Sequence, residues 1–299
     1  MRSFRSALVE RIIRLSGMKK KFIDRKEMEK YIEKKQKDQA AYTLPSLYKL
    51  GRKIEYKEYK GMDCYVFPPS SKSDKTIIYL HGGAYIEQPL IFHWNFLRKI
   101  HKETGAKIIV PIYPKAPHYT YMDSYEKVFP LYKEVIEQTD PSSLYFMGDS
   151  AGGGFALALA QLLLKKKLPQ PQHLILLSPW LDITLENKEI DAALEEIDPM
   201  IGILGAKEFG KLYAGKSDRK NYLLSPIYGE LRGLAKITLF TGTRELILPD
   251  ARKFHRLARE QNIDTNYYEY RGMNHVFPVY PIPEAKEARK MIVEIINQT

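Results

Sequence analysis

The chain has 299 residues, 44% of them hydrophobic, which is long enough to bury the core of one large α/β domain. No window approaches the roughly 18 uninterrupted apolar residues of a membrane span, and Arg or Glu breaks every apolar run near the N-terminus, so neither a spanning helix nor a signal peptide is predicted. The single cysteine, Cys64, excludes an intramolecular disulfide and a cysteine-based metal cluster. We therefore interpret the protein as cytoplasmic.

The net charge of +11 is concentrated at one end of the chain. Residues 1–60 hold 18 Lys and Arg against 8 Asp and Glu, which gives +10. The remaining residues hold 29 against 28, which gives +1. Because no nucleic-acid-binding motif accompanies this basic arm, we predict no nucleic-acid partner.

The first predicted element is a helix with one apolar stripe. Apolar residues recur at spacings of three and four, with arginines around them: Phe4, Ala7, Leu8, Ile12 and Leu15. One interpretation is that this stripe packs on the protein's own domain. The alternative is that the helix associates weakly with an anionic membrane surface, as basic amphipathic helices do. Residues 19–41 are mostly charged and are predicted to form a solvated helix.

From residue 53 onward, short β-rich runs alternate with helical stretches, which predicts a sheet with crossover helices. The first two strands alternate like antiparallel edge strands, whereas several later ones are continuous apolar runs, as expected of buried parallel strands. The predicted strands are 53–59, 64–67, 76–80, 107–111, 143–147, 173–177, 237–241 and 265–270. The predicted helices are 92–103, 123–138, 152–167, 249–261 and 284–297. An irregular, helix-like interruption covers residues 185–224.

A serine lies between the fifth predicted strand and the helix that follows it. The sequence GDSAG places Ser150 between Gly148 and Gly152, where a tight strand-to-helix turn would expose its hydroxyl as a nucleophile. The motif alone is weak, but the strand before it and the helix after it are the context that it requires.

Three further segments supply the partners that a nucleophilic serine needs. HGGAY, residues 81–85, follows a strand directly, and its glycines let backbone N–H groups face an oxyanion. GTRELILPD places Glu245 after the seventh strand, and RGMNHVFP places His275 after the eighth. The chain order Ser150, Glu245, His275 is the order of nucleophile, acid and base expected along a hydrolase sheet.

HGGAY, GDSAGG, YPKAP, LLSPW, GTRELILPD and GMNHVF, in this order, resemble the hormone-sensitive-lipase family of α/β-hydrolases over about residues 60–295. The resemblance implies a mostly parallel eight-stranded sheet flanked by helices, with a helical cap. It implies an N-terminal cap segment (1–50), a core in two parts (51–184 and 225–299) and a cap insert (185–224). It further implies a serine carboxylesterase acting on short- to medium-chain acyl esters, with the N-terminal segment and the insert forming a lid.

The resemblance also implies roles for single residues. Ser150 would be the nucleophile and His275 the base, the N–H groups of Gly83, Ala84 and Ala151 would form the oxyanion hole, and Gly82 would shape its turn. The sequence departs from the family pattern at two positions. Ala84 stands where a third glycine is common, although a methyl group leaves the backbone donor in place. Glu245 stands where aspartate is usual, and Asp250 is the alternative acid.

A small-molecule ester is the predicted partner, and the mechanism requires neither a metal nor a cofactor. Large apolar residues that flank the motifs or lie in the insert are candidate pocket walls: Trp94, Phe155, Trp180, Met200, Ile201, Phe209 and Phe277. Two other functions remain open, namely an amidase or peptidase with the same triad and a non-catalytic binding protein with the same fold. Intact Ser150 and His275 argue against the last. The sequence gives no oligomeric state.

Overall fold

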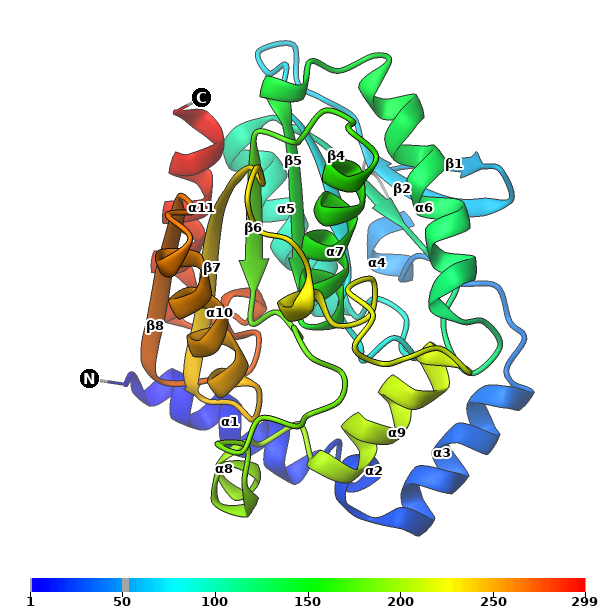
Figure 1. Ribbon diagram of the computed structural model, residues 1–299, viewed down its shortest axis with the longest axis vertical. Coiled ribbons are helices and arrows are strands. Elements are labelled where there is room, and N and C mark those ends of the chain that lie inside the picture. Colours follow the sequence, from blue (N-terminus) through cyan, green and yellow to red (C-terminus); the bar gives the residue numbers. More distant parts are fainter. Residues whose placement is uncertain (1, 50–53, 299) are drawn as a thin grey trace.

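The computed structural model of the protein describes residues 2–49 and 54–298. Within these ranges the strands form one eight-stranded sheet in the order β1-β2-β4-β3-β5-β6-β7-β8 (Figure 1). β1 and β2 pair antiparallel, as do β2 and β4, and all other neighbours are parallel. The strands are Glu55–Tyr59, Met62–Phe67, Thr76–Leu80, Lys107–Pro111, Leu144–Asp149, His173–Leu177, Lys236–Arg244 and Thr265–Asn274. The predicted mostly parallel sheet is therefore confirmed.

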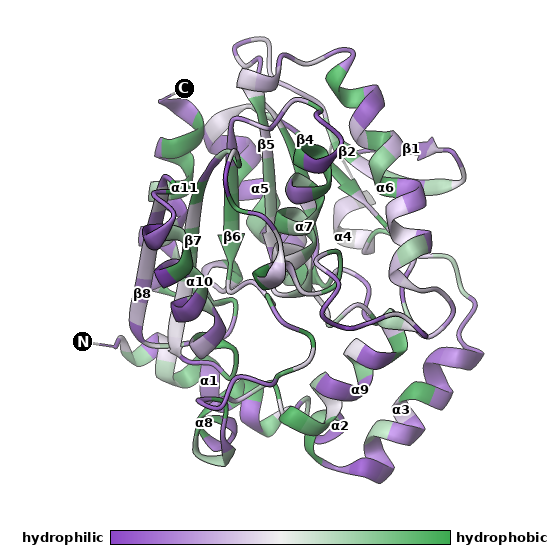
Figure 2. Ribbon diagram, in the orientation of Figure 1, coloured by the Kyte–Doolittle hydropathy of each residue, from purple (hydrophilic) through white to green (hydrophobic). Residues whose placement is uncertain are grey.

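Helices cover both faces of the sheet. One face packs against α6 (Tyr121–Ile136), α7 (Ala151–Lys165) and α10 (Leu248–Glu260), and the other packs against α5 (Ile91–Thr104) and α11 (Pro283–Asn297). Figure 2 shows the central strands as hydrophobic, and every residue of β3, β5 and β6 is buried. Continuous apolar runs form these strands because both of their faces are covered.

The predicted elements differ from the observed ones mainly at their ends. β7 and β8 continue to Arg244 and Asn274, which brings the residues after them to the carboxyl edge of the sheet. Lys53, where the first strand was expected to begin, lies outside the described residues. The expected boundary between residues 50 and 51 lies outside them as well.

Cap helices lie beyond the carboxyl ends of the central strands (Figure 1). The N-terminal part contributes α1 (Phe4–Leu15), α2 (Lys20–Ile23) and α3 (Arg25–Lys37), and the insert contributes α8 (Ala192–Ile197) and α9 (Ile203–Ala214). The short helix α4 (Ser46–Lys49) instead lies beside the sheet, where Tyr48 packs on Trp94. Short 3-10 helices cover Pro141–Ser143, Pro226–Tyr228 and Phe277–Val279. The rings of Phe22 and Phe209 meet edge to face at 5.1 Å, so the two parts of the cap pack on each other. Among the helices of the described ranges, none has both the length and the apolar character that a membrane crossing needs.

The apolar stripe of α1 does not pack on the domain. Phe4 is 83% exposed and Leu15 is 78% exposed, and the residues that α1 buries are Ser6, Glu10 and Ile13. The interpretation that the stripe covers apolar partners of its own domain is therefore wrong. Periodicity identifies residues that share a helix face, but it does not say which face turns inward.

Polar contacts hold α1 by the opposite face. The buried carboxylate of Glu10 accepts hydrogen bonds from Arg244 and Arg14, and it pairs with Arg2 at 2.7 Å. At the start of the helix, the backbone N–H and the hydroxyl of Ser3 donate to Glu284 of α11. These charge-assisted contacts take the place of the apolar packing that was expected.

Candidate active site

Ser150 occupies a sharp turn between β5 and α7. Its backbone has φ 51° and ψ −122°, a conformation that few non-glycine residues adopt. A Cβ on Gly148 would collide with the carbonyl of Gly152, and a Cβ on Gly152 would collide with the carbonyl of Leu80. The glycines therefore permit the tight turn, and the Ser150 N–H donates to the Leu177 carbonyl at 2.9 Å to fix it.

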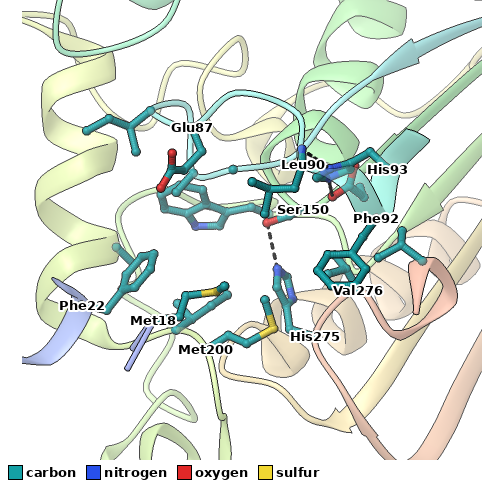
Figure 3. A pocket seen from close by; sticks show the side chains of 18 of the residues that line it. Met18, Phe22, Glu87, Leu90, Phe92, His93, Ser150, Met200, His275 and Val276 are labelled. Atoms are coloured by element: carbon teal, nitrogen blue, oxygen red, sulfur yellow. Dashed lines mark hydrogen bonds and ion pairs between the residues drawn. The ribbon is translucent and has the colours of Figure 1, made fainter. Parts of the chain in front are cut away.

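His275 lies in the turn after β8 and faces this serine. Its Nε2 is 2.8 Å from the Ser150 Oγ (Figure 3), and the residue is only 3% exposed. The next residue, Val276, has φ 51°, and its N–H donates to the Ser178 hydroxyl at 3.0 Å. This hydrogen bond fixes the turn at the carboxyl edge of the sheet, the edge at which Ser150 also lies.

Glu245 is the third member of this group of contacting residues, and it contacts His275 on the side away from Ser150. One carboxylate oxygen lies 2.8 Å from the His275 Nδ1, and the other accepts hydrogen bonds from the Thr241 hydroxyl and the Gly242 N–H. The residue is fully buried. Asp250 instead accepts from Asn187 at 2.9 Å, and burial raises its pKa to about 6. The geometry therefore pairs Glu245, and not Asp250, with the histidine.

The surroundings of His275 favour its charged form. Burial alone would lower its pKa, but the hydrogen bond and charge of Glu245, with the charges of Asp198 and Asp149, raise the pKa above the ordinary value for histidine. Asp198 was not singled out in the sequence. Its carboxylate accepts from the N–H of Leu246, directly after Glu245, so it also fixes the loop that carries the acid.

The raised pKa of His275 predicts the acid limb of the pH profile. Only the neutral ring can accept a proton from Ser150, so kcat/KM should fall as the pH drops through the raised pKa of His275. We expect the midpoint of this limb above about 6.5, the ordinary histidine value. Ester hydrolysis measured from pH 5 to 9 checks this, and a midpoint below that value would contradict it.

The loop that was expected to supply the oxyanion hole follows β3 directly. Gly83, Ala84 and Tyr85 have φ values of 121°, 53° and 58°, which turn this loop sharply after β3. Among the described residues, the N–H groups of Gly83 and Ala84 have no acceptor in the chain, and Ala151 is the first residue of α7. The Gly82 N–H differs, because it donates to Asp149 at 2.8 Å. The Gly82 N–H is therefore already paired, and its hydrogen bond holds the turn.

Asp149 and His93 form a second buried pair beside the nucleophile, which the sequence did not reveal. The Asp149 carboxylate accepts from Gly82, lies 3.2 Å from the His93 Nε2 and accepts from the Tyr79 hydroxyl at 2.5 Å. Burial would raise its pKa, but His93 and the hydrogen bonds lower it to about 2. His93 carries no motif, so only the fold brings it here.

This pair predicts a positioning effect on turnover. Asp149→Ala should lower kcat by about 10²-fold, because the Gly82 turn loses its anchor and the N–H groups of Gly83 and Ala84 move away from the reacting carbonyl. The matched control is Asp123→Ala, which removes a carboxylate that caps α6. Steady-state kinetics of both variants check this, and equal kcat values would contradict it.

A cavity of about 200 Å³ opens onto Ser150 and His275. Three of the predicted wall residues line it, namely Trp180, Met200 and Ile201, and so do further residues from the cap and the core (Figure 3): Met18, Phe22, Leu90, Phe92, Ala206, Ile247, Val276, Val279 and Tyr280. The lining is almost entirely apolar. Lys21 and Glu87 are its charged members apart from the residues around Ser150.

Four predicted wall residues lie outside this cavity. Trp94 and Phe277 belong to the apolar cluster on the α5 side of the sheet, and Phe155 packs edge to face on Tyr113 at 5.2 Å. Phe209 is covered by Phe22. Proximity to a motif in sequence did not identify wall residues, because successive side chains of an element point to different faces.

Glu87 joins the cap to the oxyanion turn. Its carboxylate pairs with Lys21 of α2 and with Lys35 of α3, the latter at 2.8 Å. Its backbone N–H donates to the Gly83 carbonyl at 2.9 Å. Burial would raise the Glu87 pKa, but the charge of Lys21 and the hydrogen bonds lower it to about 2. We call these three side chains, Glu87, Lys21 and Lys35, the cap clasp.

The sheet order and the serine, histidine and glutamate at its carboxyl edge define an α/β-hydrolase. Residues 77–279 match a protein family whose description is "alpha/beta hydrolase fold". A Mycobacterium tuberculosis protein provisionally named acetyl-hydrolase LipR is 32% identical over 226 residues, 75% of this chain and 73% of its own length.

Solved structures agree with this sequence match. A Staphylococcus aureus protein provisionally assigned as an esterase has a TM-score of 0.89 at 32% identity, covering 94% of this chain and 96% of that one. An esterase of the bacterial hormone-sensitive lipase family has a TM-score of 0.83 at 25% identity, and the match covers 100% of this chain and 99% of that one. The chain belongs to the hormone-sensitive-lipase family of α/β-hydrolases and is a carboxylic ester hydrolase.

Proposed function

We propose that this protein is a serine carboxylesterase that hydrolyses short- to medium-chain acyl esters through Ser150, His275 and Glu245. The observation that carries the proposal is the continuous chain of contacts from Glu245 to His275 to Ser150, each 2.8 Å long. A nucleophile bonded to a base, with that base oriented by a buried acid, is the arrangement that acyl transfer requires.

In the first half of the reaction, the His275 Nε2 takes the hydroxyl proton while the Ser150 Oγ bonds to the ester carbonyl carbon. The carbonyl oxygen becomes an oxyanion, and the N–H groups of Gly83, Ala84 and Ala151 stabilise it. The bond to the alkoxy group then breaks, His275 gives that group its proton, and the alcohol leaves. Water hydrolyses the acyl-enzyme by the same steps, which releases the carboxylic acid and restores the serine hydroxyl.

The size and lining of the cavity support an uncharged acyl group of limited length. Pockets that enclose drug-sized ligands span roughly 300–1,000 Å³, and this cavity holds about 200 Å³. The charged members of its cap side, Lys21 and Glu87, are paired with each other in the cap clasp. Apolar acyl chains therefore fit this lining better than charged ones, whose desolvation no free counter-charge would offset.

A series of p-nitrophenyl esters from acetate to palmitate tests the substrate class. We expect kcat/KM to peak at short or medium chains and to fall at palmitate, because the small volume of the cavity limits the chain. The matching p-nitroanilide amides separate esterase from amidase activity. Higher kcat/KM on the amides would favour the amidase alternative, and no turnover of either series would contradict the proposal.

A further inference from the structure

The apolar stripe of α1 is the exposed face of this helix, although its residues are large and hydrophobic. We define the α1 stripe as Phe4, Leu8, Ile12 and Leu15, whose exposed fractions are 83%, 47%, 57% and 78%. Ile197 at the end of α8 is 37% exposed, and its carbonyl accepts a hydrogen bond from Arg14, so α8 ends beside α1. A contiguous exposed patch of this kind marks an interaction surface.

The attachment of α1 leaves this stripe free for a partner. Glu10 is held by Arg2, Arg14 and Arg244 on the buried side of the helix, and Ser3 is held by Glu284. The helix therefore has a fixed orientation that does not depend on the α1 stripe. The α1 stripe is thus held exposed to solvent in a fixed orientation. We take this as a sign that another molecule binds to it.

The charge around the α1 stripe identifies that occupant. All charged residues that α1 exposes are arginines, since Glu10 is buried: Arg5, Arg11 and Arg14. At about 100° per residue, Arg5 and Arg11 lie on opposite edges of the stripe. Glu196 is the exposed acidic residue near its far end, and the Arg14 guanidinium donates to its carbonyl. An apolar strip edged by arginines matches a bilayer surface that contains anionic lipids.

A second copy of the chain matches this surface less well. Residues 1–60 carry +10 of the total charge, so two copies joined through α1 would bring two strongly basic segments together. An anionic lipid surface instead attracts the same segment, and the lipid tails accept the α1 stripe.

We propose that α1 docks the enzyme on the surface of membranes that contain anionic lipids. The chain continues directly from α1 to Met18, Lys21 and Phe22, which line the cavity, and α1 lies at the carboxyl ends of the strands (Figure 1). Docking through the α1 stripe therefore holds the cap side of the enzyme near the lipid, where apolar esters partition. The docking itself does not depend on the catalytic roles proposed above.

Vesicle flotation tests the docking. The full chain is mixed with vesicles of phosphatidylcholine alone, or with phosphatidylglycerol added. We expect binding to the anionic vesicles at least about tenfold tighter than to the neutral ones, and its loss in roughly 1 M salt. Equal binding to both vesicles, or binding to neither, would overturn the proposal.

Variants separate the apolar contribution from the charge. Phe4→Ser with Leu15→Ser should weaken binding to anionic vesicles by at least about tenfold, and so should Arg5→Gln with Arg11→Gln. Tyr56→Ser, which alters a 56% exposed residue of β1 at the opposite end of the sheet, is the matched control and should bind like the wild type.

Two further measurements distinguish a loss of vesicle binding from a folding defect and from the dissociation of a dimer. The serine double variant should hydrolyse p-nitrophenyl acetate, a soluble ester, and unfold thermally like the wild type, because both side chains are exposed. Light scattering without lipid measures the mass in solution. A dimer that this variant dissociates would identify a second copy as the occupant and overturn the proposal.

Discussion

Ser150→Ala is expected to lower kcat for p-nitrophenyl butyrate by a factor on the order of 10⁶, as loss of a catalytic serine does elsewhere. The hydroxyl oxygen is the atom that would bond to the ester carbon, and within residues 2–49 and 54–298 no other hydroxyl forms a hydrogen bond with the His275 Nε2. Alanine keeps the Cβ and the backbone of the turn, so the thermal unfolding midpoint should stay close to that of the wild type.

Ser143→Ala provides the matched control for this variant. Ser143 lies just before β5, at the opposite end of the strand from Ser150, and its hydroxyl donates to Asp74. Its removal should leave kcat unchanged. Appreciable turnover by purified Ser150→Ala would show that a different group attacks the ester.

Glu245→Gln should lower kcat by about 10⁴-fold, the loss seen when a triad carboxylate becomes an amide. The carboxylate holds the Nδ1 proton of His275 and, at the same time, accepts from Gly242 and Thr241. An amide of the same shape offers one acceptor oxygen in place of two, and it carries no charge to stabilise the imidazolium that forms during attack.

Asp250→Asn separates the two candidate acids. Asp250 contacts Asn187 and does not contact His275, so we expect less than about a tenfold change in kcat. Comparing the kcat values of both variants on the same ester decides the assignment. A larger loss in Asp250→Asn than in Glu245→Gln would transfer the role of acid to Asp250.

The parts of the site that could be predicted from the sequence are those that local backbone geometry determines. Gly148 and Gly152 are required by a turn within a few residues of Ser150, and such turns leave a readable motif. Glu245 follows a strand that is itself readable as a short apolar run, and His275 follows the tyrosine-rich run at residues 265–270. The order of these residues along the chain then fixes their meeting at one edge of the sheet.

The features that the sequence did not predict, namely the orientation of α1 and the pairing of His93 with Asp149, depend on contacts between distant parts of the chain. The orientation of α1 is decided by Glu10 and Arg244, which are 234 positions apart, and helix periodicity carries no information about that pair. Likewise, His93 reaches Asp149 only because α5 lies beside β5 in the folded protein. Trp94, one residue later in α5, points in a different direction and packs on the ring of Tyr65.

The cap clasp makes the entrance of the site and the oxyanion turn one mechanical unit. The Glu87 carboxylate pairs with Lys21 and Lys35, and the Glu87 N–H donates to the Gly83 carbonyl. A displacement of α2 or α3 would therefore also move the turn that contains the Gly83 N–H. A cap grafted from a relative would therefore leave the half-buried Glu87 without a counter-charge unless it carried a basic residue at the position of Lys21 or Lys35. In this chain, a change of the cap therefore also changes the position of the oxyanion turn.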